Sequence, residues 1–347
     1  MSLLKNLEKL SNACDVVGRE EEVRNLMIEM LKPYADEIVV DKLENVIAIK
    51  KGKKGSPKVM LAAHMDEIGL MVKTISKEGF LRFAKMGGID DRILLAQRVI
   101  VYTEKGMLPG VIGSKPPHIQ KDAERKKIVS FDELFIDVGA ENREDAAKMG
   151  VKIGDPIGFD VKFAEIGRNL VIGKAFDDRV GCAVIVETLR KIGKTDCTIY
   201  AVGTVQEEVG LRGATAAAFG IDPDVGIALD VTVAGDVPGV KDTDTPVKMG
   251  KGPTLTVADY GLITHPKILR LLKDTAKKSK IPYQLETGLR GTTDAARISL
   301  TRQGVPSGTI TVPTRYIHSP TSMVNLGDVE KAAKLATEAI KRIKKTF

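Results

Sequence analysis

The sequence predicts an α/β protein whose main sheet is interrupted by a small, separate β-rich unit. Two observations support this fold class. Residues 1–69 and 165–347 alternate short apolar runs, typical of buried strands, with amphipathic helical stretches. Residues 70–164 consist mainly of short alternating pieces separated by glycine, proline and charged residues, with one helix at 143–149. We therefore expect a discontinuous domain, 1–69 and 165–347, and an inserted β-rich domain, 70–164.

The composition is that of a soluble globular protein. Of the 347 residues, 43% are hydrophobic and 29% charged. The net charge of +7 comes from scattered lysines and arginines without interleaved aromatic residues, which argues against nucleic-acid binding. Three cysteines without CxxC spacing argue for reduced thiols, and no apolar run has the length of a membrane span. We expect a cytoplasmic protein that does not bind membranes.

The N-terminal part predicts two helices, a hairpin and a buried strand. Residues 3–10 and 19–31 are helical, and the second stretch places its apolar side chains on one stripe and its glutamates in the first turn. Pro33 ends that helix. Alternation in 38–52 indicates a β-hairpin. The run VMLAAH then forms a strand that ends at His64, with Asp66 two residues further on.

The chain after the insertion predicts four more strands, each followed by a residue able to bind a metal. LVIGKAF leads to Asp177 and Asp178, and the run 199–202 leads to Glu207 and Glu208. VGIALD ends at Asp230, and GTITVP leads through a short loop to His318. Helices are expected at 179–192, at 269–278 and at 329–343, the last one capped by Asp328.

These strand ends predict a metal site. In open α/β sheets the carboxyl ends of the parallel strands share one edge, so two imidazoles and three carboxylates would meet there. Nitrogen and oxygen ligands without thiolates suit a pair of divalent ions better than calcium or a structural zinc. One carboxylate must bridge, because five residues cannot complete two separate shells. Two such ions can lower the pKa of a water and polarise a carbonyl.

The adjacent acids Glu207 and Glu208 are expected to have different roles. Neighbouring residues in extended chain point to opposite sides, so one can hold a cation while the other faces a water or a substrate. Asp66 stands where it can accept the second ring proton of His64 and fix the tautomer. His118 on the stiff KPPHI turn is either idle or offered to a neighbouring subunit or a substrate, and His265 is expected to be structural or idle.

Five motifs closely resemble those of the tetrahedral (TET) aminopeptidases, dinuclear metallopeptidases also called deblocking or glutamyl aminopeptidases. They are AAHMDEIG at 62–69, KAFDDRVG at 174–181, QEEVGLRGA at 206–214, ALDVT at 228–232 and HSP at 318–320, and the resemblance spans essentially the whole chain. The resemblance implies one metal on His64, Asp177 and Asp230, and a second on Asp177, Glu208 and His318. It also implies Glu207 as the general base, Asp66 behind His64, and Asp178 beside the ligands after a peptide bond that is often cis in related enzymes.

The resemblance implies a fold and an assembly as well. The main domain would be a three-layer, mixed-sheet catalytic domain of the zinc-exopeptidase (phosphorylase/hydrolase-like) type, and 70–164 a dimerisation domain. Twelve subunits, built from dimers, would form a hollow tetrahedron. Each subunit would hold two divalent ions, zinc or cobalt, and act on peptide substrates as an aminopeptidase.

Three other functions use similar residues. A carboxypeptidase or an amide deacylase could use the same five ligands. A glycosidase needs paired carboxylates but leaves the two imidazoles unexplained. A non-catalytic assembly or metal-storage protein has no use for a base beside the metals. The sequence leaves the preferred N-terminal residue open: Thr292, Thr293 and the loop 233–245 are candidate pocket residues, beside a glycine-bearing loop and helix at 288–300.

Overall fold

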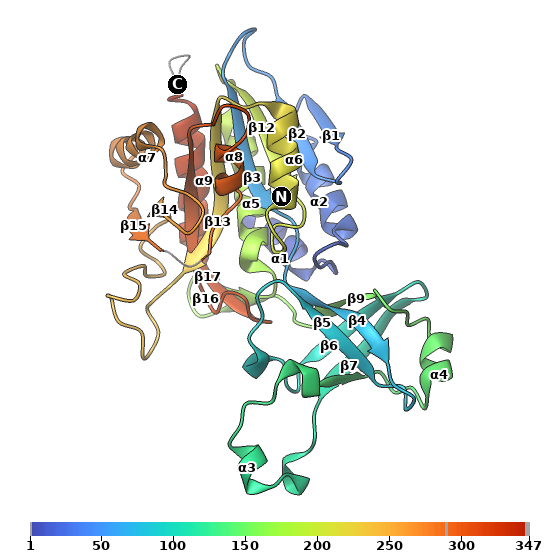
Figure 1. Cartoon of the computed structure of the whole chain (residues 1–347). Coiled ribbons are helices and arrows are strands. Elements are labelled where there is room, and N and C mark those ends of the chain that lie inside the picture. Colours follow the sequence, from blue (N-terminus) through green and yellow to red (C-terminus); the bar gives the residue numbers. More distant parts are fainter. Residues whose placement is uncertain (1, 289–290, 344–347) are drawn as a thin grey trace.

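The computed structural model describes residues 2–288 and 291–343. It contains a large α/β domain and a smaller closed β-barrel, which lies at the lower end of the molecule in Figure 1. An α/β fold with a mixed sheet and an inserted β-rich unit confirms the predicted fold class. Residues 289 and 290 of the predicted glycine-bearing loop lie outside the described part of the chain.

The large sheet has eleven strands in the described residues. Nine follow one path and two more, β14 and β15, branch from β16. In spatial order the nine are β1 (Glu37–Val40), β2 (Val46–Lys50), β12 (Thr198–Thr204), β3 (Lys58–His64), β13 (Val225–Val233), β16 (Ser307–Arg315), β17 (Ser322–Asn325), β11 (Leu170–Gly173) and β10 (Ala164–Ile166). The branch consists of β14 (Thr254–Ala258) and β15 (Gln284–Thr287).

Parallel pairing in the middle of the sheet brings four strand ends to one edge. β12, β3, β13 and β16 are parallel neighbours, with Thr204 opposite His64 and Asp230 opposite Thr311. β11 is joined to β16 through two antiparallel pairings with β17, so it runs in the same direction. The carboxyl ends of all five strands that were expected to carry ligands therefore point the same way.

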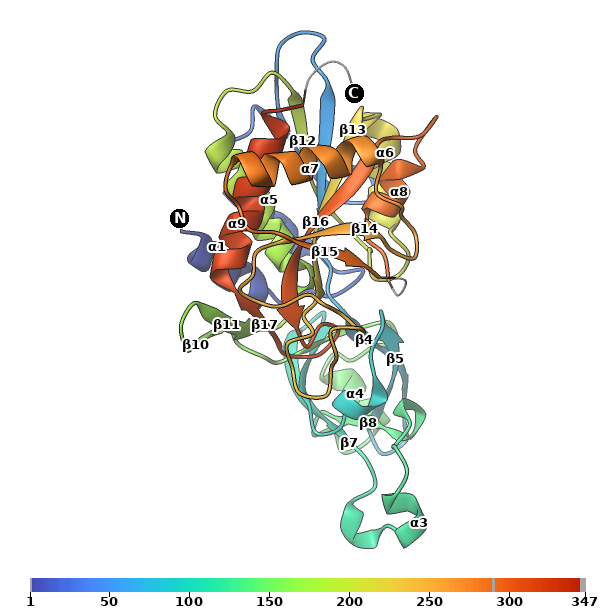
Figure 2. The same cartoon turned by 90° about the vertical axis from the view of Figure 1, so that its left-hand side faces the viewer.

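Helices cover both faces of this sheet, which makes three layers (Figures 1 and 2). One face carries α1 (Leu3–Asn12), α2 (Glu21–Leu31), α5 (Phe176–Ile192) and α9 (Leu326–Ile340), with α7 (Pro266–Lys278) against α9. The other face carries α6 (Arg212–Ile221) and α8 (Ala295–Ser299). The alanine-rich sequence of α6 lets it lie close to the sheet, where Ala214, Ala217 and Ala218 pack against Met60 and Val202.

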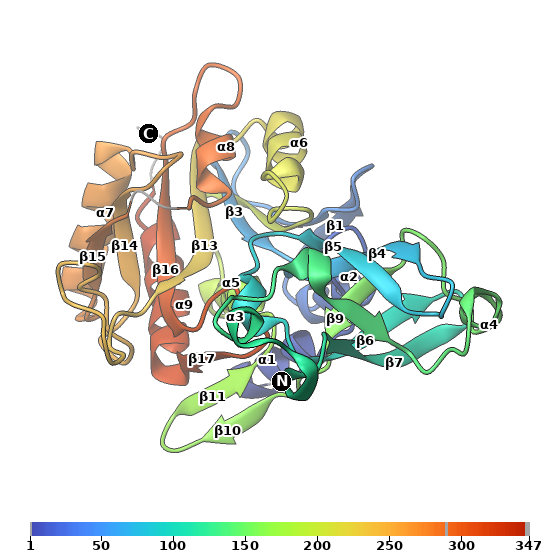
Figure 3. The same ribbon diagram turned by 60° about the horizontal axis from the view of Figure 1, so that its bottom comes forward.

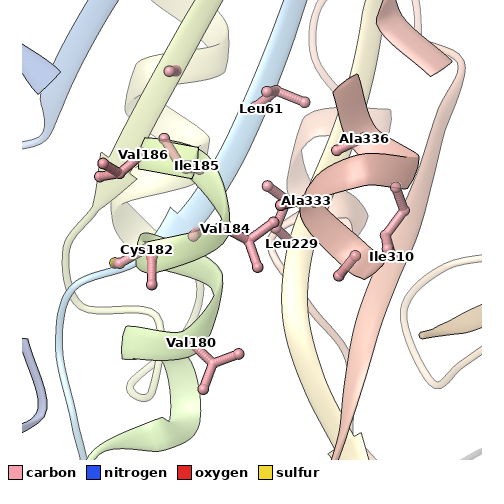
Figure 4. Packing of buried hydrophobic residues seen from close by; sticks show 14 of the residues in the cluster. Leu61, Val180, Cys182, Val184, Ile185, Val186, Leu229, Ile310, Ala333 and Ala336 are labelled. Atoms are coloured by element: carbon pink, nitrogen blue, oxygen red, sulfur yellow. The ribbon is translucent and has the colours of Figure 1, made fainter. Parts of the chain in front are cut away.

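The main core lies around α5, which is buried along almost its whole length. Figure 4 shows Val184 of α5 beside Leu229 of β13 and Ala333 of α9. Small residues on α9 allow it to approach α5 closely, and the branched side chains of α5 fill the space between helix and sheet. Because Asp177 stands at the start of this buried helix, the helix holds that carboxylate at the edge of the sheet.

The barrel has its own apolar core. Its strands close in the order β4 (Gly69–Ile75), β5 (Leu81–Met86), β8 (Phe135–Asp137), β7 (Gly106–Gly113), β6 (Arg98–Thr103) and β9 (Pro156–Phe159). Inward-facing residues such as Leu81, Val101 and Ile136 are fully buried. The short helix α4 (Arg143–Lys148) packs outside. β4 begins five residues after His64, so the barrel starts directly beside the predicted site.

A protruding segment connects β7 to β8. It contains the single turns η2 (Pro117–Ile119) and η3 (Phe131–Glu133) and the short helix α3 (Asp122–Arg125), and it extends away from the α/β domain (Figures 1 and 2). Ile119 and Ile128 are 67% and 65% exposed on it. In Figure 3 this end of the molecule is turned toward the viewer.

Some expected details differ from the structure. Asp328 does not cap the last helix: Asn325 does, by accepting from the amide of Gly327. Asp328 is buried and accepts from the amides of Gly250 and Gly252 instead. The helix expected from 19 begins at Glu21. α6, β14 and β15 were not predicted, because small residues and short edge strands give little periodic signal. No helix among the described residues has the length and apolar character needed to cross a membrane.

Candidate active site

Two groups of potential metal ligands meet at the carboxyl edge of the parallel strands. In each group one ligand atom per residue lies within 4.8 Å of the others. The first group is His64, Asp177 and Asp230, and the second is Asp177, Glu208 and His318. Asp177 belongs to both groups. The two sets are those implied by the resemblance, and they come from five different places in the chain.

His64 is buried at the last position of β3 and is held on several sides. Its Nε2 lies 3.0 Å from Asp177 Oδ1, and its main-chain amide donates to Asp178 Oδ2 at 3.2 Å. Its Nδ1 lies 3.1 Å from the main-chain oxygen of Asp66 and 3.6 Å from the Asp66 carboxylate. The nearer acceptor for the second ring proton is thus the main chain of Asp66, where we had expected its carboxylate.

Asp177 lies between the two histidines. Its Oδ1 faces His64, and its Oδ2 lies 3.3 Å from Nε2 of His318. The peptide bond between Asp177 and Asp178 is cis, in agreement with the resemblance. Asp178 is fully buried and accepts from the amides of His64 and Gly181, so it ties the start of α5 to the end of β3. This places the Asp177 carboxylate where both groups can use it.

His318 is oriented by the barrel. Its Nδ1 lies 2.7 Å from the main-chain oxygen of Gly88, which follows β5. Since that oxygen can only accept, Nδ1 carries a proton, and Nε2 is the ring nitrogen that faces Asp177 and Glu208. Gly87 and Gly88 pass so close to the site that a Cβ on either would lie 3.0 Å from Glu208 Oε2 or His318 Nδ1. The barrel therefore completes one side of the site.

The two glutamates follow β12 on a turn that Asp66 fixes. The amides of Glu207 and Glu208 donate to Oδ1 and Oδ2 of Asp66 at 3.0 and 3.1 Å, and Asp66 is fully buried. Oε1 of Glu208 lies 3.7 Å from His318 Nε2, whereas Oε2 of Glu207 lies 3.9 Å from His64 Nε2. The two carboxylates thus approach different parts of the cluster, and Glu207 stands outside both ligand groups.

Several buried carboxylates lie close together around the two imidazoles, and their mutual repulsion and burial shift the pKa values of the cluster. Burial, together with the charge of Asp177, raises the pKa of Glu208 to about 7 and holds the pKa of Asp230 well above its usual value. The hydrogen bond to Asp177 raises the pKa of His318 to about 10. Oε1 of Glu208 is buried and has no hydrogen-bond partner among the described residues. A divalent cation would relieve this repulsion and satisfy that oxygen, so the residues fit a metal.

A cavity of about 420 Å³ opens beside the cluster, lined by His64, Asp177, Glu207, Asp230 and His318. Thr292 and Thr293 also line it, as predicted, but of the predicted loop 233–245 only Val233 does so. The sequence reasoning missed Glu286 and Asp259 on its wall. Glu286 lies on the short strand β15, and four residues gave no periodic signal that could have found it.

The other two histidines take no part in the cluster. His118 is exposed on the protruding segment. His265 caps α7 by accepting from the amide of Lys267, which agrees with the structural role expected for it. All four histidines of the sequence are thereby accounted for, two in the candidate site and two elsewhere.

A three-layer α/β fold with an inserted β-rich unit is the fold of the zinc-exopeptidase type, and the histidines and carboxylates gather at the carboxyl edge of its parallel strands. Residues 44–335 match the family of M42 glutamyl aminopeptidases. The chain belongs to this family, and it is therefore an aminopeptidase.

Known relatives agree over nearly the full length. A putative aminopeptidase of Acetivibrio thermocellus is 46% identical over 96% of this chain and 97% of its own, and a lysyl aminopeptidase of Pyrococcus furiosus is 40% identical over 97% and 96%. The crystal structure of a TET aminopeptidase from a marine sediment archaeon of the Thaumarchaeota has a TM-score of 0.96 at 45% identity, covering 99% of this chain and 97% of that one. The Pyrococcus horikoshii TET1 peptidase, which can assemble into a tetrahedron or a large octahedral shell, has a TM-score of 0.88 at 33% identity, covering 99% and 100%.

Proposed function

We propose that the chain removes single amino acids from the N-termini of peptides, using two divalent metal ions and Glu207 as the general base. The observation that carries this proposal is the pair of ligand groups that share Asp177 beside an open cavity. His64, Asp177 and Asp230 would hold one ion, and Asp177, Glu208 and His318 the other. Such a pair activates water and polarises a carbonyl when it is bound.

The mixed donor set favours zinc or cobalt. Each group offers one imidazole nitrogen and carboxylate oxygens, which borderline divalent ions accept, and neither contains a thiolate. Each histidine has its other ring nitrogen against a main-chain oxygen, Asp66 for His64 and Gly88 for His318. This arrangement presents Nε2 of both rings as a ligand, as is usual for metal-bound histidines.

Glu207 is placed to move the proton. Its carboxylate lines the cavity, and it belongs to neither ligand group, so it stays free to accept a proton from a water and to pass it to the leaving amine. Asp66 is a positioning residue in this scheme. By accepting both backbone amides of the glutamate pair, it fixes the angle at which Glu207 and Glu208 diverge.

The first test compares substrates with free and with blocked amino groups. An aminoacyl anilide with a free amine should be hydrolysed. Its N-acetylated counterpart should react at least roughly a hundredfold more slowly, because the site would lose its contact with the amine. A peptide with a blocked amine and a free carboxylate serves as the matched control. If that peptide were the better substrate, the chain would be a carboxypeptidase, and release of acetate from the acetylated anilide would indicate a deacylase.

We also propose that the chain assembles into a dodecamer built from dimers, with the barrel and its protruding segment in the interfaces. Support comes from the exposed isoleucines at 119 and 128 on a segment that packs little against its own subunit. Closed symmetric assembly is the usual way to cover such a surface, and the assemblies of the TET1 relative are consistent with it.

The double variant Ile119→Lys, Ile128→Lys should reduce the mass of the particle in solution. Both side chains are exposed, so the subunit should fold, whereas two buried ammonium groups would oppose the interface. Light scattering and sedimentation measure the mass, and hydrolysis of an aminoacyl anilide checks the subunit. Val39→Lys, on the edge strand β1 at the far end of the molecule, is the control. An unchanged mass in the double variant would remove this segment from the interface.

A further inference from the structure

The carboxylate of Glu286 is fixed on the cavity wall by threonine hydroxyls from three neighbouring strands. Thr232 of β13 donates to Oε2 at 2.6 Å, and Thr256 of β14 donates to Oε1 at 2.7 Å. Thr311 of β16 lies 3.4 Å from Oε1, and its hydroxyl is also 3.3 Å from the main-chain oxygen of Thr254. All four side chains line the same cavity as the metal-ligand groups. Two short hydrogen bonds from different strands therefore hold this carboxylate in place on the cavity wall.

Around Glu286 these hydrogen bonds leave acceptors facing the cavity. A threonine hydroxyl has one proton, so Thr232 and Thr256 turn their remaining lone pairs outward once they donate to Glu286. The carboxylate itself offers about four lone-pair positions, of which the hydroxyls use two or three. The group that best completes such a wall is a multiple donor with positive charge, an ammonium or a guanidinium.

Strand geometry places Glu286 one long side chain away from the first ligand group. Asp230 and Thr232 lie on the same face of β13, and Thr311 is directly opposite Asp230 in the sheet. Two residues along a strand span about 7 Å, so the carboxylate bound by Thr232 stands roughly that far from Asp230. An N-terminal residue whose amine is held at the metals can bridge this distance only with an extended side chain such as that of lysine or arginine.

A second carboxylate adds to the charge of the cavity. Asp259 accepts with Oδ1 from the amides of Gly261 and Leu262 and from the hydroxyl of Thr292. Its Oδ2 is buried and without a partner among the described residues, and Asp259 lines the cavity. Within the described part of the chain, no lysine or arginine lines this cavity. Among the described residues, the wall beyond the metal ligands is therefore anionic.

We propose that this cavity selects substrates whose N-terminal residue is lysine or arginine, with Glu286 as the residue that binds the positive charge. The proposal rests on the proposed function, because it names the substrate class of the same site. A glutamate at this position would face the carboxylates of Glu286 and Asp259 and be repelled. An apolar residue would cover Glu286 and leave its charge without a partner.

The parent protein gives the first measurement. We expect kcat/KM for lysyl anilide to exceed that for norleucyl anilide, which has the same side-chain carbons without the terminal ammonium group, by roughly tenfold to a hundredfold. Glutamyl anilide should be the poorest substrate of the set. Hydrolysis of all three at similar rates would overturn the proposal and leave the aminopeptidase activity standing. Failure to hydrolyse any of them would instead contradict the proposed function.

The variant Glu286→Gln gives the second measurement. It keeps the size and the acceptor for one threonine but removes the charge, so the ratio of lysyl to norleucyl hydrolysis should fall toward one. Glu330→Gln, the same change at an exposed position on α9, should leave the ratio as in the parent. Glu286→Asp, which keeps the charge and shortens the side chain, should retain part of the preference. A lysyl preference that survives Glu286→Gln in folded protein would assign the selection elsewhere.

Binding without turnover gives an independent readout. In the Glu207→Gln background, calorimetry should show lysinamide binding more tightly than norleucinamide by a similar factor, and adding Glu286→Gln should remove the difference. Equal affinity for the two amides before the second substitution would overturn the proposal, whatever the rates show.

Discussion

Replacing Glu207 by glutamine should reduce kcat by roughly 10² to 10⁴ while the protein keeps both metal ions and its fold. Glutamine has nearly the same shape, and the amide of residue 207 would still donate to Asp66, so the turn after β12 should hold. What the variant lacks is a group that can accept the proton of the attacking water. The measurements are steady-state hydrolysis of an aminoacyl anilide and metal content after exhaustive dialysis.

The same substitution one residue later is the matched control. Glu208 belongs to the second ligand group, and one of its oxygens has no protein partner, so Glu208→Gln should lose about one metal per subunit. If Glu207→Gln emptied a site while Glu208→Gln stayed full, the roles of the two glutamates would be the reverse of those proposed.

Replacing Asp177 by asparagine should have the largest effect on metal content, because this carboxylate belongs to both ligand groups. We expect the protein to lose both ions and its activity to fall to the level of chelator-treated parent. His318→Ala should lose one ion only, since the first group does not contain it. Metal analysis of the purified variants, with the parent before and after chelation and re-addition of zinc or cobalt, makes the comparison.

Asp196→Asn is the control for Asp177→Asn, because its side chain is 76% exposed and pairs with Lys53 at the surface. It should keep both ions and full activity. Retention of one full equivalent of metal by Asp177→Asn would show that Asp177 does not bridge. Full activity of the metal-free parent would contradict the two-metal mechanism as a whole.

Much of the candidate site could be predicted because its residues have ligand side chains and stand at the ends of apolar strands. His64, Asp230 and the glutamate pair each follow an apolar run, and parallel strands bring such positions to one edge whatever the details of the loops. His265 could also be set aside, since it follows a loop, whereas the sequence left His118 open between an idle role and contact with a neighbouring subunit or a substrate.

The parts that could not be predicted depend on the main chain or on short strands. The main-chain oxygens of Asp66 and Gly88 orient the two imidazoles. Every residue has such an oxygen, so the sequence does not indicate which ones bind a histidine. Glu286 lies on a four-residue strand that branches from the sheet, and only tertiary pairing brings it to Thr232 and Thr256. Asp328 looked like a helix cap because it precedes an apolar run, but its burial lets it bind the loop at Gly250 and Gly252.

The contact between His318 and Gly88 limits how this protein could be recombined with its relatives. A chimaera with the barrel of a relative would have to place a main-chain carbonyl at hydrogen-bond distance from Nδ1 of His318. It would also need small residues at positions 87 and 88, since a Cβ there would lie 3.0 Å from Glu208 Oε2 or His318 Nδ1. If the junction were one residue too long or too short, both domains could still fold, but His318 would lose its hydrogen bond to residue 88 and could rotate. The barrel therefore cannot be exchanged independently of the α/β domain. In a chimaera, the crossover points must keep the loop that follows β5 in its place beside His318.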